Sequence, residues 1–279
     1  MTGHFEESLG FTNRELKIAE QIGDRNRIGW VLFVQGWSHG NLGNLKKTEE
    51  IFLEAIEIAN ESKDRRLDIF IRNSLCIALS HLGRFDEAAE IGLDSVRRAE
   101  DINQINMMNF SKTFLAYHYN QVEEWQKAME LLDIVEASLV ESDARAILNF
   151  MLPRQTWAHW GLGELEAAAQ KAEESLKHGK AVGAVQVQAD AHCYFAQIYF
   201  SQDKWEPALE SAEKAIALAA PEKYRIRQGR SLYWKAKILL AQDNKTASKE
   251  AADQALELFE YCEAQPDIDR TRKLLKEIG

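Results

Sequence analysis

The chain has 279 residues and a formal net charge of −10, with 28% charged and 46% hydrophobic residues. This acidic balance argues against general nucleic-acid binding, which needs clustered Lys and Arg beside phosphates. The longest apolar runs fall short of eighteen residues and the first residues, MTGHFEESLGF, do not resemble a signal peptide, so we expect neither membrane insertion nor export. Three widely spaced cysteines, Cys76, Cys193 and Cys262, predict reduced thiols and a cytoplasmic location.

A period of forty residues organises the chain. A turn-forming position recurs at Gly43, Gly83, Glu123, Gly163, Asp203 and Asp243. Seven residues before it, a small side chain recurs at Gly36, Cys76, Ala116, Thr156, Ala196 and Ala236. Five residues after it, another recurs at Thr48, Ala88, Ala128, Ala168, Ala208 and Ser248. Because two antiparallel helices approach closely only where small side chains meet, this pattern predicts a stack of helical hairpins.

The predicted elements follow this register from end to end. Residues 3–22 match only the second helix of a repeat, and we interpret them as a half repeat. Six repeats of forty residues follow over 26–264, with helix pairs predicted at 26–42 and 46–62, 65–82 and 86–101, 104–121 and 125–140, 144–161 and 165–180, 184–201 and 205–219, and 222–241 and 246–264. An amphipathic stretch at 267–278 predicts a C-terminal capping helix. With four prolines and no Gly/Ser-rich linker, we expect one continuous domain over 1–279.

The half repeat has two interpretations. The chain is a piece of a longer protein whose preceding helix completes the repeat, or the single helix is itself the cap of the array. An uncapped end exposes an apolar face, so self-association through the N-terminal half repeat is a further expectation.

The repeat resembles the tetratricopeptide repeat (TPR) family. The residues that carry the likeness are Leu32, Gly36, Thr48, Phe52 and Ala55 in the first full repeat, Leu115, Ala116, Tyr119 and Ala128 in the third, and Ala196, Tyr199, Ala208 and Ala215 in the fifth. The usual closing proline is absent, and the period of forty exceeds the commoner 34. Such long repeats resemble sensor domains of bacterial signalling ATPases and transcriptional regulators. The likeness implies an all-α, right-handed TPR-like α-solenoid, a superhelix of antiparallel helix pairs.

The same resemblance implies a binding surface on the first helix of each repeat, which lines the concave side in the family. Its inward positions are the second, fifth, ninth and twelfth residues, counted here from Gly29. The predicted ligand-binding residues are Trp30, Phe33, Trp37, Phe70, Asn73, Phe110, Thr113, Tyr117, Asn120, Phe150, Trp157 and Trp160. The alternative is that these rings pack between repeats, which we weigh equally at the second position, where Phe recurs. The stretch carries almost no charge, which argues against an acidic C-terminal tail as the ligand.

No catalytic constellation, phosphate-binding loop or zinc-type cysteine spacing occurs in the sequence. We therefore expect a non-enzymatic interaction scaffold, without cofactor or metal, that binds a peptide or helix of a protein partner in a groove lined by aromatic rings. The alternative is a ligand-sensing regulatory domain that holds a small apolar effector and is cut from a larger signalling ATPase, cyclase or transcriptional regulator.

Overall fold

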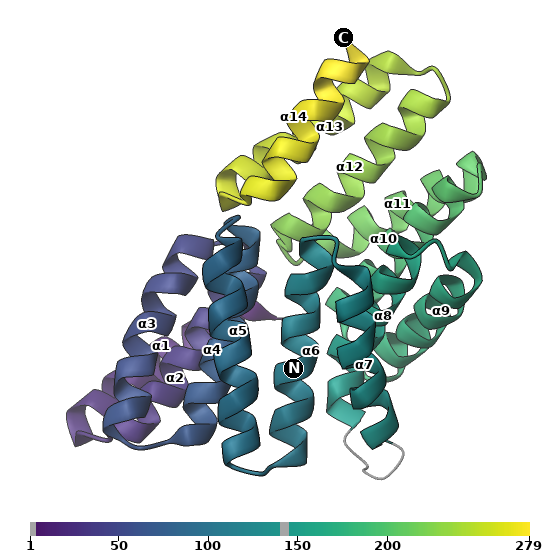
Figure 1. Ribbon diagram of the computed structural model, residues 1–279. Helices are drawn as coiled ribbons and strands as arrows, with labels where there is room; N and C mark the ends of the chain where they lie inside the picture. The colour runs from purple at the N-terminus through teal and green to yellow at the C-terminus, as the bar shows by residue number, and fades with distance from the viewer. Residues whose placement is uncertain (1–3, 140–144) are drawn as a thin grey trace. The chain divides into compact units, whose positions relative to one another are not determined.

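The computed structural model describes residues 4–139 and 145–279, which form fourteen α-helices and a short 3-10 turn and contain no strand. Gly3, Val140 and Ala144, at the ends of predicted helices, lie outside the described residues. The helices are α1 Phe5–Ile22, α2 Arg25–Asn41, α3 Leu45–Glu61, α4 Arg65–His81, α5 Phe85–Asp101, α6 Ile105–Gln121, α7 Trp125–Leu139, α8 Leu148–Gly161, α9 Leu165–Ala181, α10 Val185–Ser201, α11 Trp205–Ala219, α12 Arg225–Ala241, α13 Lys245–Cys262 and α14 Gln265–Ile278 (Figure 1). The all-α prediction is confirmed for the part of the chain that the structure describes.

Left-handed backbone ends the helices at a fixed interval. All six predicted turn positions have positive φ, from 57° at Asp203 to 87° at Gly43. A second series lies twenty residues out of phase with the first and also has positive φ, at Gly23, Lys63, Asn103, Gly183, Lys223 and Glu263. Aspartates begin two of the helices, because Asp24 and Asp64 each accept a 3.0 Å hydrogen bond from a backbone N–H of the following turn.

Close approach at the small positions holds each hairpin together. Gly36 of α2 lies under the ring of Phe52 on α3, and a Cβ there would stand 2.4 Å from the ring edge. The Thr48 hydroxyl donates to the Gly36 carbonyl at 3.3 Å. The sixth repeat makes the same link, where Ser248 donates to the Ala236 carbonyl at 2.8 Å. The predicted role of the small residues is therefore seen directly in these two hairpins.

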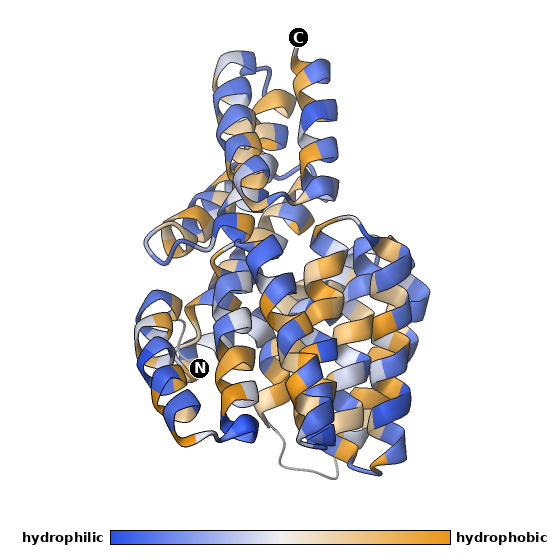
Figure 2. Cartoon of the chain, turned by 90° about the vertical axis from the view of Figure 1, so that its left-hand side faces the viewer, coloured by the Kyte–Doolittle hydropathy of each residue, from blue (hydrophilic) through white to orange (hydrophobic). Residues whose placement is uncertain are grey.

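The described chain divides into two compact units, residues 4–147 and 148–279, each with its own core. One continuous domain over 1–279 therefore stays a prediction. Within a unit, each first helix contacts the first helix of the next repeat, as α4 does with α2 and α6, and α10 with α8 and α12. The first helices thus form the tighter layer. Figure 2 shows hydrophobic and hydrophilic residues interspersed along the helices, as in amphipathic helices.

The last helix, α14, stands in the register of a first helix and covers the end of the second unit. It buries Ile268, Leu274 and Ile278. Its Asp267 is 4% exposed and accepts two hydrogen bonds from Arg230 of α12, at 3.2 and 3.1 Å. Charged side chains stand exposed on the remaining face of α14, which is the arrangement that a solenoid cap requires.

Candidate functional site

Aromatic rings form a ladder across the first helices of the unit at residues 4–147. Trp30 on α2 meets Phe70 on α4 edge to face, with ring centroids 5.9 Å apart, and Phe70 meets Phe110 on α6 at 5.8 Å. Phe33 also reaches Phe70, at 5.7 Å. All four rings remain partly exposed. The rings therefore both join successive repeats and present apolar surface to solvent.

A second row of rings follows toward the ends of the same helices. Trp37 of α2 lies 6.0 Å from Phe114 of α6, measured between ring centroids. Tyr117 of α6 hydrogen-bonds His81 of α4, with 2.9 Å between the hydroxyl oxygen and Nε2. We call the six partly exposed rings of both rows the ring surface: Trp30, Phe33, Trp37, Phe70, Phe110 and Tyr117.

The three polar residues of the predicted site lie between helices. Asn73 is 1% exposed, and Thr113 and Asn120 are 0% exposed. Ser95 of α5 donates to the Asn73 side-chain carbonyl at 2.7 Å and lies 3.2 Å from the Ser111 hydroxyl, so this cluster ties α4, α5 and α6 together. The part of the predicted site that faces solvent in this unit consists of rings rather than amides.

A hydrogen bond fixes the orientation of Trp30. Its indole N–H donates to Asp64 at 3.0 Å, and the Asn26 amide donates to the same oxygen at 2.9 Å. Burial opposes ionisation of Asp64, but these bonds and backbone N–H donors, chiefly that of Leu67, outweigh it and lower the pKa of the carboxyl. Asp64 thus stays charged and anchors the end of the ladder.

The unit at residues 148–279 carries a separate group of rings. Trp157 is only 7% exposed, with the guanidinium of Arg230 5.3 Å from its ring centroid. Trp160 meets Trp234 edge to face at 5.6 Å and donates its indole N–H to the Ser201 hydroxyl at 3.0 Å. Phe150, the third predicted site residue of this unit, lies 5.7 Å from the Arg154 guanidinium.

Lys237 of α12 is enclosed by three rings. Its ammonium lies 4.5 Å from the ring centroid of Trp234, 5.0 Å from Phe200 and 5.9 Å from Tyr233. Burial lowers the pKa of Lys237. The three rings thus hold the Lys237 side chain through cation–π contacts.

Sequence reasoning missed several of these rings. Phe114, Tyr194 and Trp234 all stand at the sixth position of the repeat, which was not among the inward positions considered. The forty-residue register already contained this signal, because the position is aromatic in three repeats out of six.

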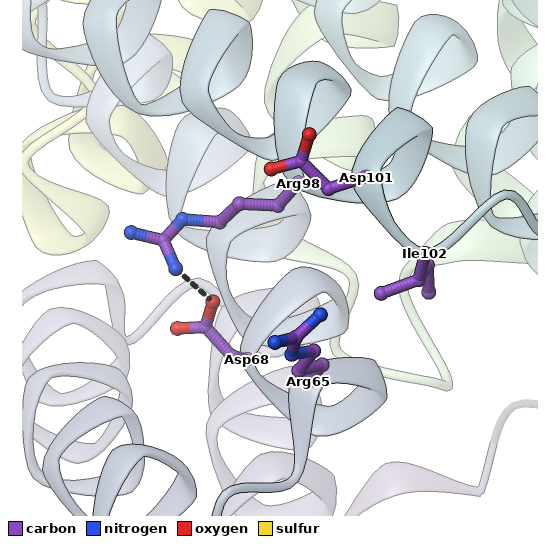
Figure 3. A pocket seen from close by; sticks show the side chains of 5 residues that line it. All are labelled: Arg65, Asp68, Arg98, Asp101 and Ile102. Atoms are coloured by element: carbon purple, nitrogen blue, oxygen red, sulfur yellow. Dashed lines mark hydrogen bonds and ion pairs between the residues drawn. The ribbon is translucent and has the colours of Figure 1, made fainter.

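Two pockets lie on α3, α4 and α5, on a different face of α4 from the ladder. The smaller, of about 230 Å³, is polar and is lined by Arg65, Asp68, Arg98, Asp101 and Ile102. Figure 3 shows the Arg98 guanidinium turned toward Asp68, which accepts from it at 3.1 Å. Asp68 also accepts from Arg72 at 2.9 Å. The carboxylates here neutralise the guanidinium groups, so the pocket offers little net charge to a ligand.

The larger pocket, of about 440 Å³, has an apolar floor and a charged rim. Leu53, Leu75, Leu79 and Ile91 form the floor, and Leu53 is 50% exposed. The rim includes Arg84, which forms ion pairs with Glu49 and Glu87. The repeat pattern did not predict these two pockets, which α4 lines together with α3 and α5.

Three further observations bear on the predicted chemistry. No group of three or more His, Cys, Asp or Glu able to hold a metal ion occurs among the described residues. Cys76, Cys193 and Cys262 are buried free thiols. Within residues 4–139 and 145–279, every helix is too short or too polar to cross a membrane.

Comparison with known proteins supports one fold. The sequence profile of the tetratricopeptide repeat matches residues 229–262, which include the small position Ala236 and the turn at Asp243. No curated protein sequence matches the chain.

Three solved structures illustrate the likeness. A Rap protein in complex with competence and sporulation factor superposes with a TM-score of 0.63 at 11% identity, over 94% of this chain and 78% of that one. NprR in complex with its cognate peptide NprX gives 0.65 at 14% identity, over 99% of this chain and 81% of that one.

The third is a signal transduction ATPase with numerous domains and a tetratricopeptide repeat sensor, from Pyrococcus horikoshii. Its TM-score is 0.65 at 13% identity, over the whole of this chain and 42% of that one. The hairpin register, the first-helix layer and these matches agree that the chain has a TPR-like helical-repeat fold, in which residues 229–262 match the tetratricopeptide repeat itself.

Proposed function

We propose that the chain is a non-enzymatic scaffold that binds a peptide segment or an amphipathic helix of a protein partner on the ring surface. The observation that carries this proposal is the ladder of partly exposed rings that runs without a break over α2, α4 and α6. Exposed apolar surface of this kind favours binding, because the free energy falls when a ligand covers it. Aromatic residues contribute much of the binding energy in such contacts. The six side chains of the ring surface are uncharged, which favours apolar side chains in the ligand, and the charged Asp64 lies beside Trp30 at its end.

Relatives in fold support this proposal. The Rap protein and NprR adopt the same fold, and their structures hold competence and sporulation factor and the peptide NprX. The proposal also includes Trp160 of the second unit, whose ring meets that of Trp234 edge to face. Phe150 and Trp157 belong to the same proposal, although Trp157 is only 7% exposed.

A selected peptide tests the proposal. Peptides chosen from a displayed random library would be labelled and titrated with the wild-type chain by fluorescence anisotropy. The Trp30→Ala/Trp37→Ala variant should bind at least tenfold more weakly, because each truncated anchor costs more than 1 kcal/mol.

Tyr261→Ala is the matched control, since Tyr261 is an aromatic residue of α13 that is 58% exposed. Its affinity should equal that of the wild type. Equal affinity of the wild type and the double variant, with helicity retained, would refute the assignment of the ring surface.

A second candidate function is sensing of a small apolar effector. It is favoured by the likeness to the signalling ATPase with a TPR sensor, of which this chain spans 42%. An effector that binds only the folded chain raises its melting temperature by mass action. A screen of small apolar compounds by thermal shift, repeated on the Trp30→Ala/Trp37→Ala variant, separates this function from peptide binding.

Location and assembly complete the proposal. Three buried free thiols fit the reducing conditions of the cytoplasm. Self-association through the N-terminal half repeat is a separate proposal that involves α1 alone.

A further inference from the structure

The larger pocket of the first unit is a groove between α3 and α5, and α4 forms its bottom. We call it the α3–α5 groove. Leu79 of its floor follows Phe70 by about two and a half helical turns, so the groove and the ring surface lie on opposite sides of α4. Its volume of about 440 Å³ is typical of sites that hold a ligand.

Apolar side chains form the interior of the groove. Leu75 and Leu79 of α4 are 2% and 4% exposed and close the bottom, whereas Leu53 of α3 is 50% exposed and stands at the edge. An apolar side chain that entered the groove would cover Leu53 and contact the floor. Burial of this apolar surface would favour binding.

Every guanidinium group on the rim already has a carboxylate partner. Arg72 donates to Asp68 at 2.9 Å and lies 3.3 Å from Asp94. Arg97 also lies 3.3 Å from Asp94, and Arg84 forms the two ion pairs described above. An anionic ligand would have to compete with these carboxylates, so the rim disfavours a negatively charged occupant.

Glu90 is different from the other carboxylates of the rim. It lies about one helical turn from Glu87 and from Asp94 on α5, and all three line the groove. Glu87 and Asp94 have guanidinium partners, but the Glu90 side chain forms no ion pair or hydrogen bond within residues 4–139 and 145–279. Four carboxylates and three guanidinium groups line the groove, so its rim has a net charge of −1.

The next repeat shows how a cation occupies the equivalent place. Forty residues after Leu79 and Glu87 stand Tyr119 and Lys127. The Lys127 ammonium lies 5.6 Å from the Tyr119 ring centroid and pairs with Glu124. In the α3–α5 groove the lysine is replaced by Glu87, which pairs with Arg84 instead. A cation above this floor must therefore come from another molecule.

We propose that the α3–α5 groove binds a basic amphipathic segment of a protein partner. Leucine or isoleucine side chains of the segment contact the apolar floor and Leu53, and a lysine or arginine pairs with Glu90. The aliphatic part of that long side chain adds apolar contact while its charge stays at the rim. This site is separate from the ring surface, so it does not depend on the proposed function.

Two designed peptides test the chemistry of the occupant. One is an amphipathic helix of Leu and Lys, and the other has the same pattern with Glu in place of Lys. Each is labelled and titrated with the full chain by fluorescence anisotropy at physiological salt. The Lys peptide should bind, and the Glu peptide should bind at least tenfold more weakly.

Variants locate the binding site. Glu90→Lys should weaken binding of the Lys peptide about fivefold or more, because repulsion replaces attraction, and Leu53→Ser should weaken it about fivefold. The matched controls lie on α7. Glu130→Lys changes the net charge equally at the equivalent position, where Lys127 is already near, and Ile134 is 51% exposed. Glu130→Lys and Ile134→Ser should bind as the wild type does.

Three results would overturn the proposal: no binding of the Lys peptide, tighter binding of the Glu peptide, or equal effects of Glu90→Lys and Glu130→Lys with helicity retained. The Trp30→Ala/Trp37→Ala variant should bind the Lys peptide as the wild type does. Loss of binding in that variant would assign the peptide to the ring surface, which would overturn this inference and support the proposed function.

Discussion

Alanine at Gly36 tests how closely the two helices of a hairpin approach. A glycine in the interior of an exposed helix costs about 1 kcal/mol relative to alanine, so Gly→Ala usually stabilises. At Gly36 the new Cβ would stand 2.4, 2.6 and 3.0 Å from the Cε1, Cδ1 and Cζ atoms of Phe52. Phe52 is 1% exposed, so its ring cannot move into solvent. The substitution must therefore push α2 and α3 apart.

The expected magnitude follows from two opposing terms. Overpacking a close-packed core costs about 1–3 kcal/mol, and the gain in helix propensity offsets up to about 1 kcal/mol. We expect a net loss of about 1–2 kcal/mol in the free energy of unfolding of the first unit. The opposite sign is expected for Gly10→Ala on α1, where no atom lies within 4 Å of the added Cβ.

The assay is urea unfolding followed by tryptophan fluorescence, to which Trp30 and Trp37 of the same hairpin contribute. Gly36→Ala would be measured alone and with Phe52→Leu, which removes the ring edge. The two changes should couple by about 1 kcal/mol or more, and the alanine should become neutral or stabilising in the Leu background. An equal effect of Gly36→Ala in both backgrounds would refute the close-approach argument.

Three further predictions concern single residues. Gly163→Ala should cost about 1 kcal/mol through backbone strain alone, because Gly163 has φ +79° and open space around it; calorimetry that shows no loss would contradict this. Burial lowers the pKa of His118, so below pH 6.5 the unfolded chain binds a proton at this residue more readily than the native chain does. The free energy of unfolding should therefore fall as the pH drops below 6.5, by up to about 1.4 kcal/mol per pH unit. His118→Asn should flatten that slope in urea titrations at several pH values. Asp267→Ala should cost about 3 kcal/mol because it removes a buried carboxylate that accepts two hydrogen bonds from Arg230, whereas an unchanged melting temperature would show that α14 is held otherwise.

The repeat register was predictable because the turn position and the two small positions recur in each repeat. Turn residues such as Gly43 and Gly163 predict a left-handed backbone conformation, and the small residues predict close approach of the two helices of a hairpin. The second series of turns carried a weaker signal, because Lys63, Lys223 and Glu263, unlike Gly23, Asn103 and Gly183, are not typical of positive φ. Packing of one repeat on the next imposes that conformation, and a propensity argument cannot detect it.

The candidate site was predictable only in part. Rings at the second and ninth positions could be placed from the register, and Trp30, Phe70 and Phe110 do form a ladder. The burial of Asn73 could not, because it depends on how near α5 lies to α4. The pockets beside α3 and α5 were missed for the same reason, since spacing between neighbouring second helices is a tertiary property.

Within the described residues, the left-handed positions at intervals of twenty also make the repeats similar at their ends. Ala184, before α10, has φ −86° and ψ 91°, and Tyr224, before α12, has φ −77° and ψ 69°. Removing residues 185–224 would join two points of like backbone direction and leave every later helix in its original phase. The array can thus lengthen or shorten by whole hairpins, so the extent of its binding surface can evolve, or be engineered, without redesign of any contact within a repeat.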